Sequence, residues 1–159
     1  MLSFRLNQSV LSQRAGIIPK CDCAHFRPLL PSVRMNLQTK TGVVAIVDDD
    51  ESMRVAVQNL LSSVGIIARS FGSAEEFLLS GLQAEAACLI SDIRMPDMTG
   101  LELQARLVAD GRRIPIIFIT AYGNVRSRTQ ALEAGAVEFL VKPFDDEHLI
   151  KTVRKALED

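Results

Sequence analysis

Apolar and polar positions follow two patterns between residue 42 and the end of the chain. Short continuous apolar runs predict strands covered on both faces, and three-and-four spacing predicts amphipathic helices between them. The predicted strands span 43–47, 66–70, 86–90, 115–119 and 137–141, and the helices between them span 53–64, 74–79, 100–109 and 124–134. A last helix follows Asp145 and Asp146, which are expected to cap it. This alternation predicts an α/β domain with a parallel sheet and helices on both faces.

Two of these helices carry a further signal. Ser73, with Glu76 three residues later, predicts a capping box at the start of helix 74–79. Helix 124–134 has a thin apolar stripe, made mainly of Val125, Ala131 and Leu132. A weakly anchored helix suits a moving element, although the same pattern is also typical of a marginal helix.

Residues 1–41 form a tail with a different character. They show no sustained period, contain three prolines, and hold more basic than acidic residues. Few acids with scattered Arg and Ser are typical of a targeting peptide. We prefer a disordered or non-native extension, because Met35 lies at a natural distance for an initiator before the first strand. The domain is therefore expected to span 42–159.

The composition excludes several classes of protein. The body after the tail is acidic, which argues against direct nucleic-acid binding. No apolar run is long enough to span a bilayer, so no membrane association is expected. Cys88 is expected in the core, and Cys21 and Cys23, with His25, are interpreted as tail residues rather than a metal cluster. The cysteines predict no disulfide framework, and we expect a reducing, cytoplasmic location.

Polar residues follow four of the five predicted strands. Asp48 and Asp49 follow the first strand, Asp92 the third, Thr120 the fourth and Lys142 the fifth. The carboxyl ends of parallel strands lie at one edge of a sheet, so these groups can converge there. Taken singly, each has an ordinary explanation: an acidic helix start, a cap or a turn. Their common position at the strand ends is harder to explain in that way.

Three carboxylates at one edge repel each other unless a cation neutralises them. Hard oxygen ligands around a cation that also meets phosphate oxygens are typical of Mg²⁺. Lys142 supplies a point charge and Thr120 a hydroxyl, which suit an incoming phosphoryl group. Asp92 is then predicted to be the nucleophile that forms an aspartyl phosphate.

At this point the sequence resembles the receiver domain of two-component response regulators, and most closely the FixJ-type receivers. The resemblance covers essentially all of 42–158. It is carried by the motifs Ile46-Val47-Asp48-Asp49-Asp50, Asp92-Ile93-Arg94-Met95-Pro96-Asp97-Met98-Thr99-Gly100, Ile119-Thr120-Ala121 and Val141-Lys142-Pro143-Phe144. It implies a flavodoxin-like, doubly wound sheet of five parallel strands in the order 2-1-3-4-5, with five helices.

The resemblance also implies roles for single residues. Asp92 resembles the phosphoacceptor. Asp48 and Asp49 resemble the acidic pair that holds Mg²⁺ together with Asp92, and the backbone carbonyl of Arg94 would complete the protein's ligands. Thr120 and Lys142 resemble the switch hydroxyl and the phosphate-binding lysine, and Phe139 occupies the position of the switch aromatic residue.

The implied function is a phosphorelay switch rather than an enzyme, with slow autodephosphorylation. A sensor histidine kinase or hybrid kinase would pass a phosphoryl group from a phosphohistidine to Asp92. Thr120 would turn inward to bond the group and Phe139 would follow, which shifts the population between two packings. The face formed by the fourth helix, fifth strand and fifth helix would then bind a downstream protein or a second copy. Arg94 and Tyr122 border the phosphate in the family, so exchanging them is expected to alter the phosphoryl lifetime.

Other interpretations remain open. FixJ-type regulators usually continue into a DNA-binding helix-turn-helix, and none follows Lys142 in this sequence, which predicts a stand-alone receiver or a truncated longer product. Asp48-x-Asp50 followed by Ser52 faintly resembles the signature of Mg²⁺-dependent phosphatases with an aspartate nucleophile. That alternative leaves Asp92 and Thr120 without roles. A third alternative is a binding module that no longer needs phosphate.

Overall fold

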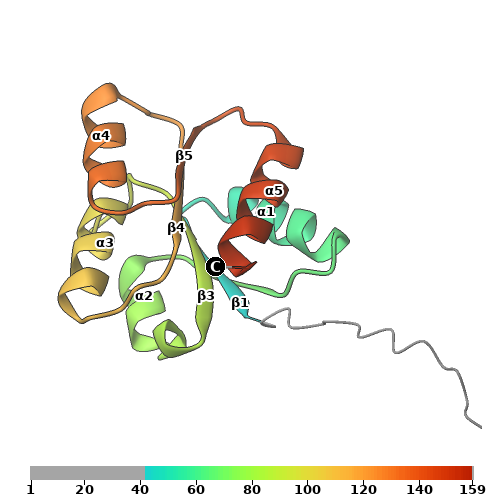
Figure 1. The fold of residues 1–159 in the computed structure, drawn as a ribbon, viewed down its shortest axis with the longest axis horizontal. Helices are drawn as coiled ribbons and strands as arrows, with labels where there is room; N and C mark the ends of the chain where they lie inside the picture. Colours follow the sequence, from blue (N-terminus) through green and yellow to red (C-terminus); the bar gives the residue numbers. More distant parts are fainter. Residues whose placement is uncertain (1–41, 159) are drawn as a thin grey trace, which may run out of the picture. The chain divides into compact units, whose positions relative to one another are not determined.

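The apolar runs form a parallel sheet in the computed structural model, which describes residues 42–158 (Figure 1). The strands are β1 (Val43–Val47), β2 (Ala68–Phe71), β3 (Ala86–Ser91), β4 (Ile116–Thr120) and β5 (Glu138–Val141). The helices are α1 (Glu51–Ser63), α2 (Ala74–Leu79), α3 (Gly100–Ala109), α4 (Val125–Glu133) and α5 (Asp146–Glu158). All neighbouring strands are parallel and their order is β2-β1-β3-β4-β5, which confirms the predicted fold class.

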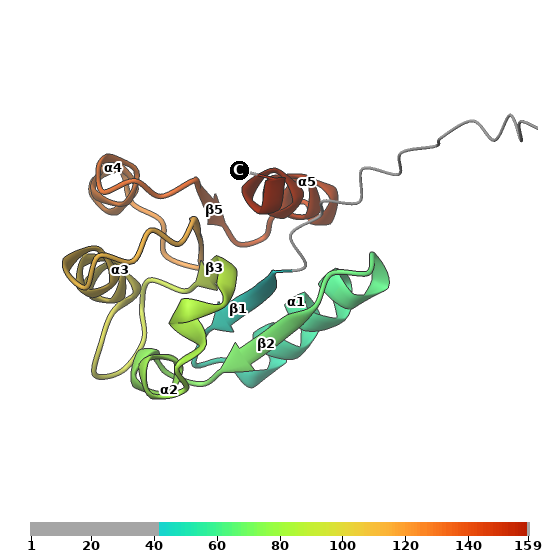
Figure 2. The same cartoon turned by 60° about the horizontal axis from the view of Figure 1, so that its bottom comes forward.

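Alternation along each strand divides the core between the two faces of the sheet. In β1, Val44 and Ile46 pack with α1 and α5, whereas Ala45 and Val47 pack with the helices on the other face. Figure 2 shows α1 and α5 on one side of the sheet, and α2, α3 and α4 on the other. Because both faces are covered, the three central strands β1, β3 and β4 are nearly continuous apolar runs, as their sequences predicted, whereas the edge strand β2 contains Arg69 and Ser70.

Four of the five strands have bounds that differ by one or two residues from the predictions, and β3 differs only in that it extends to Ser91. β2 begins at Ala68 rather than Ile66, because the N–H of Ile66 donates to the carbonyl of Leu61 and closes the end of α1. β4 begins after Pro115, which has no N–H to donate, and it includes Thr120. β5 begins at Glu138. A short 3₁₀ helix at Leu82–Ala84 was not predicted.

The helix caps also correct one prediction. Ser73 accepts a hydrogen bond from the N–H of Glu76, but the Glu76 carboxylate bonds to the N–H of Gly72, so the predicted box is only half formed. The complete capping box lies at the start of α3. There, the Thr99 side chain accepts from the N–H of Glu102, whose carboxylate accepts from the N–H of Thr99.

Predictions about residues 1–41 concern residues outside the described structure, and they stay predictions. These include the disordered or non-native extension and the interpretation of Cys21, Cys23 and His25. Cys88 is fully buried, and burial raises the pKa of its thiol to about 12. Between residues 42 and 158, every helix is too short or too polar to cross a membrane.

Candidate functional site

The strand ends meet at one edge of the sheet, as parallel pairing requires. The N–H of Asp92 donates to the carbonyl of Val47, the residue before Asp48, at 2.9 Å. The N–H of Lys142 likewise donates to the carbonyl of Thr120 at 2.9 Å. These backbone bonds place the polar residues at the carboxyl ends of β1, β3, β4 and β5 along one edge.

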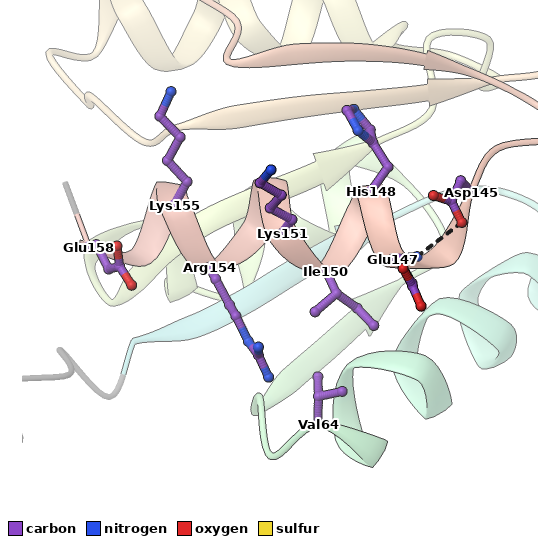
Figure 3. Close-up of a pocket in the computed structure, with 9 residues that line it drawn as sticks. All are labelled: Val64, Asp145, Glu147, His148, Ile150, Lys151, Arg154, Lys155 and Glu158. Atoms are coloured by element: carbon purple, nitrogen blue, oxygen red, sulfur yellow. Dashed lines mark hydrogen bonds between the residues drawn. The ribbon is translucent and has the colours of Figure 1, made fainter.

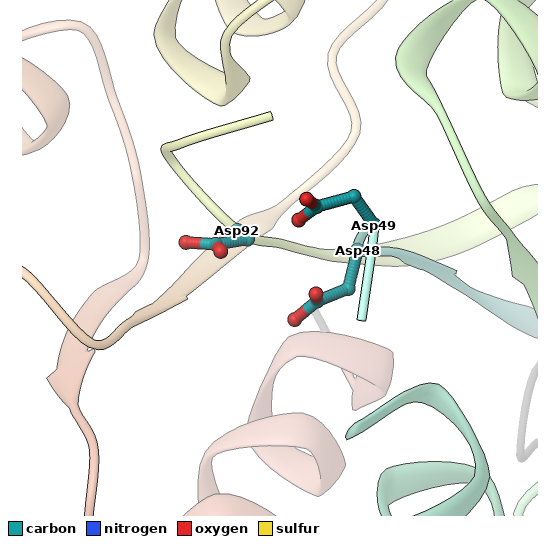
Figure 4. Close-up of side chains that lie close together, drawn as sticks. All are labelled: Asp48, Asp49 and Asp92. Atoms are coloured by element: carbon teal, nitrogen blue, oxygen red, sulfur yellow. The ribbon is translucent and has the colours of Figure 1, made fainter. Parts of the chain in front are cut away.

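Three carboxylates gather at this edge. One oxygen from each of Asp48, Asp49 and Asp92 lies within 4.8 Å of the others (Figure 4). Asp48 is 4% exposed, Asp49 is exposed and Asp92 is partly buried. The cluster is therefore buried at Asp48 and open to solvent at Asp49, which suits a cation that also keeps water or phosphate ligands.

Asp48 sits at the floor of the cluster and has two compensating partners. Its Oδ2 lies 3.2 Å from Nζ of Lys142, and its Oδ1 accepts a hydrogen bond from the N–H of Asp50 at 2.8 Å. Burial nevertheless raises the pKa of Asp48 above its usual value, and the charge of Asp92 raises it further. The ionised carboxylate is thus incompletely compensated, and the donor set fits a divalent cation.

Asp92 is held by the loop that follows it. Its Oδ1 accepts from the N–H groups of Ile93 at 2.6 Å and Arg94 at 3.4 Å. Gly100, at the start of α3, packs so closely that an added Cβ would lie 2.1 Å from the carbonyl oxygen of Asp92. A residue with any side chain at position 100 would force this loop to move.

Thr120 and Phe139 lie beneath the edge. Thr120 is fully buried, and its Oγ1 accepts from the N–H of Tyr122 at 3.3 Å. Phe139 is 2% exposed, and its ring centre lies 6.5 Å from that of Phe118. The inward position expected for Phe139 after phosphorylation is therefore already filled here, so burial of this ring does not require the phosphoryl group.

Two contacts at the edge were missed by sequence reasoning. The guanidinium of Arg54, on α1, donates to the carbonyl of Asp48 at 2.7 Å and braces the loop between β1 and α1. The guanidinium of Arg94 lies over the ring of Tyr122, with Cζ 4.5 Å from the ring centre. No sequence motif singles out Arg54. The contact between Arg94 and Tyr122 joins two separate loops, and such a contact leaves no periodic pattern in the sequence.

A separate groove runs along α5, away from the predicted site residues (Figure 3). Ile150 and Arg154 point from α5 toward Val64 at the end of α1, while Lys151 and Lys155 point away from it. None of the residues predicted for phosphoryl chemistry lines this groove. This groove is therefore separate from the carboxylate edge.

Comparison with known proteins supports this assignment. The family described as the response regulator receiver domain matches residues 44–154. The response regulator protein TmoT of Ectopseudomonas mendocina is 40% identical over 124 residues, which cover 78% of this chain and 56% of TmoT. The transcriptional regulatory protein FixJ of Azorhizobium caulinodans is 39% identical over 114 residues, which cover 72% of this chain and 54% of FixJ.

A solved structure, that of FixJ-N, is similar in fold as well as in sequence. It shares 38% identity and a TM-score of 0.67, and the match covers 74% of this chain and 94% of FixJ-N. These matches confirm the resemblance inferred from the motifs, including its FixJ-type character. The chain spans about half the length of the curated relatives that it matches.

Proposed function

The chain belongs to the response regulator receiver domain family, and on that premise we propose that Asp92 accepts a phosphoryl group from a sensor histidine kinase or hybrid kinase. Receiver domains of this family interact with histidine kinases and downstream effectors in two-component systems. The observation that carries the proposal is the convergence of Asp48, Asp49 and Asp92 with Lys142 at one sheet edge.

Each residue at the edge has a part in this proposal. Asp48, Asp49 and Asp92, with the backbone carbonyl of Arg94, would hold Mg²⁺, which supplies positive charge to the carboxylates and the phosphoryl oxygens. Asp92 attacks phosphorus through a carboxylate oxygen, and the histidine nitrogen leaves. Lys142 exchanges its contact with Asp48 for the phosphoryl group, and Thr120 donates its hydroxyl hydrogen to it.

The proposed output surface is the face formed by α4, β5 and α5. Glu138 on β5 lies between Arg128 of α4, at 3.9 Å, and His148 of α5, at 3.7 Å. Val125 and Val141 leave apolar surface exposed beside them. A rearrangement of this face on phosphorylation would change its fit to a downstream protein or a second copy of the chain. Hydrogen exchange that changes equally in α1 and α4 after phosphorylation would contradict this assignment.

Labelling with a small phosphodonor tests the proposal. The full chain is incubated with acetyl phosphate and Mg²⁺, and intact mass is measured; one gain of about 80 Da is expected. Asp92→Asn should abolish the gain, and chelation of Mg²⁺ should suppress it. Asp97→Asn is the matched control, because Asp97 is an exposed carboxylate of the same loop with φ of 64°, a conformation that Asn tolerates.

The same experiment separates the alternatives. Labelling that persists in Asp92→Asn, or repeated turnover of the donor that depends on Asp48, would favour an aspartate-nucleophile phosphatase. A wild-type chain that gains no mass from either acetyl phosphate or a kinase would favour a binding module without phosphoryl chemistry. Whether the receiver acts alone stays a prediction, and a kinase phosphotransfer profile would identify its donor.

A further inference from the structure

A cleft of about 510 Å³ lies between the ends of α3 and α4. These helices cover the same face of the sheet (Figure 2). β4 begins at Ile116 and β5 begins just after Val137, and both residues line the cleft. The cleft therefore lies at the amino ends of these strands, opposite the carboxylate edge. Its volume falls within the range of about 300–1,000 Å³ that is typical of small-molecule sites.

The walls of the cleft are mainly apolar. Leu107 and Ile116 are almost fully buried where they line it, whereas Val108 and Val137 leave part of their apolar surface exposed. One buried polar side chain, that of Gln104, also lines the cleft, and it is 2% exposed. Apolar walls with a few polar groups in fixed positions are typical of a site for a small organic molecule.

Two arginines bring positive charge to the cleft. Arg112 and Arg113 are exposed residues of the loop between α3 and β4, and both line it. Within residues 42–158, neither guanidinium forms a salt bridge. Arg106, in the last turn of α3, is by contrast paired with Asp110 at 3.2 Å. Among the described side chains, the charges of Arg112 and Arg113 are therefore uncompensated.

The ends of the two helices decide how much of this charge remains. Each helix is followed by a glycine of positive φ that lines the cleft, Gly111 after α3 and Gly135 after α4. A helix carboxyl end carries about half a negative charge, so the two ends offset about one of the two guanidiniums. Glu133, in the last turn of α4, lies outside the lining. The remaining positive charge favours an anion at this cleft.

We propose that this cleft binds a small organic carboxylate with an apolar body, such as a medium-chain acid. The apolar part packs against Leu107, Val108 and Val137, and the carboxylate accepts hydrogen bonds from Arg112 and Arg113. A small molecule is favoured over a protein segment, because both arginines and the buried amide line one cleft of ligand size. The site is independent of phosphoryl chemistry, since its lining includes none of the residues assigned to that chemistry.

The bound carboxylate also strengthens the contact between α3 and α4. Gln104 Nε2 donates to the carbonyl of Ala131, the one buried residue of α4, at 3.1 Å. Ala134 and Gly135, which follow α4, line the cleft directly. A ligand that binds only the folded state stabilises the elements that it contacts. Binding should therefore slow hydrogen exchange in α4 more than in α1, which lies on the other face of the sheet.

Titration of the ¹⁵N-labelled full chain with octanoate, followed by amide chemical shifts, tests this proposal. Saturable shifts are expected at Arg112, Arg113 and Gly135. Octan-1-ol keeps the chain without the charge, and acetate keeps the charge without the chain. Each should bind at least about five-fold more weakly than octanoate, because it lacks one half of the recognition. Equal binding of either would overturn the proposal, as would octanoate shifts that are absent or centred on the groove along α5.

Variants locate the site. Arg112→Gln and Arg113→Gln should each weaken octanoate binding by about two- to five-fold, as expected for an exposed ion pair. Val108→Glu should weaken it further, because it replaces an apolar contact by a negative charge at an exposed helix position. Val55→Glu is the matched control, since Val55 is an exposed valine of α1 outside the cleft.

The same variants define the outcomes that overturn the site. Unchanged affinity in Val108→Glu, or an equal loss in Val55→Glu, would show that octanoate binds elsewhere. Hydrogen exchange with and without octanoate provides the second measurement. Equal slowing in α1 and α4 would contradict binding between the ends of α3 and α4. Failure of Asp92 to become labelled would reject the proposed function and leave this site unaffected.

Discussion

Helices α3 and α4 pack on the same face of the sheet, and each follows a strand that leads into a site residue. In α3, Gly100, Leu103, Gln104 and Leu107 are buried, and a complete capping box begins the helix. In α4, Ala131 is the one buried residue, and a single side-chain bond caps the first turn. The loop between Asp92 and α3 therefore leads into a firmly packed helix. The loop between Thr120 and α4 leads into a helix that can shift with little loss of packing.

This difference in packing between α3 and α4 suits the proposed switch. Under the proposed function, the loop that carries Asp92 would keep its geometry in both states, because Asp92 would have to meet the carboxylates of Asp48 and Asp49. The loop after Thr120 would respond to the phosphoryl group and pass the change to the α4–β5–α5 face. A protein with this function benefits from unequal local stability in two neighbouring helices.

The largest expected difference is in the free energy of unfolding. Leu103 is fully buried, so Leu103→Ala should lower the free energy of unfolding by about 2–5 kcal/mol. Leu132 of α4 is 38% exposed, so Leu132→Ala should lower it by less than about 1 kcal/mol. Urea unfolding measures both. Equal losses would show that α4 is anchored as firmly as α3.

Two glycines flank α3: Gly100 begins the helix, and Gly111 lies two residues after its end. At Gly100 an added Cβ would lie 2.1 Å from the Asp92 carbonyl oxygen and 3.0 Å from the ring of Phe118. Gly100→Ala should lower stability by about 1–3 kcal/mol and also slow labelling of Asp92, because the acceptor loop must move. Acetyl phosphate labelling rates and urea unfolding test this.

Gly111 provides the control for that experiment. It has φ of 71° and nothing within 4 Å of an added Cβ, so Gly111→Ala introduces backbone strain without a clash. Stability should fall by roughly 1–2 kcal/mol, while the labelling rate of Asp92 stays at the wild-type value. Equal slowing in both variants would mean that labelling follows global stability rather than loop position.

Much of this organisation was predictable from sequence, because it depends on local patterns. The bounds of α3 follow from its apolar spacing, and the site follows from the rule that parallel strand ends share an edge. The contacts that distinguish the two helices were not predictable in this way. No sequence pattern marks Gln104 as buried, and the burial of Phe139 depends on packing against Phe118, which is distant in the chain. Such contacts leave no periodic signal.

Gln104 allows a finer test of how α4 is held. Its side-chain Nε2 donates to the carbonyl of Ala131 at 3.1 Å, a buried link from α3 to the last turns of α4. Gln104→Ala should reduce stability by about 1 kcal/mol and accelerate hydrogen exchange in α4 more than in α3. Gln58→Ala is the control, because Gln58 makes similar bonds to Ala68 and Ser70 in another part of the fold. Equal acceleration in both helices would contradict a specific role for Gln104.

The smallest expected effect is a pH dependence confined to α3. Hydrogen bonds from the backbone and side chain of Thr99 hold the pKa of Glu102 below its ordinary value of 4.5. A carboxyl with a lowered folded-state pKa stabilises the fold above its unfolded pKa, and this contribution disappears as pH falls through the folded-state value. Glu102→Gln should therefore lower the urea midpoint slightly at neutral pH and progressively less below pH 4.5.

The cap of α4 should behave differently, since the Asn124 side chain that accepts from the N–H of Ser127 does not titrate. Asn124→Ala should lower the free energy of unfolding by about 1 kcal/mol at every pH at which the fold persists. Urea titrations of both variants across this range measure the two profiles. A loss in Glu102→Gln that does not change with pH would show that the capping box stabilises α3 through geometry alone. A pH-dependent loss in Asn124→Ala would remove the proposed contrast between the two helix starts.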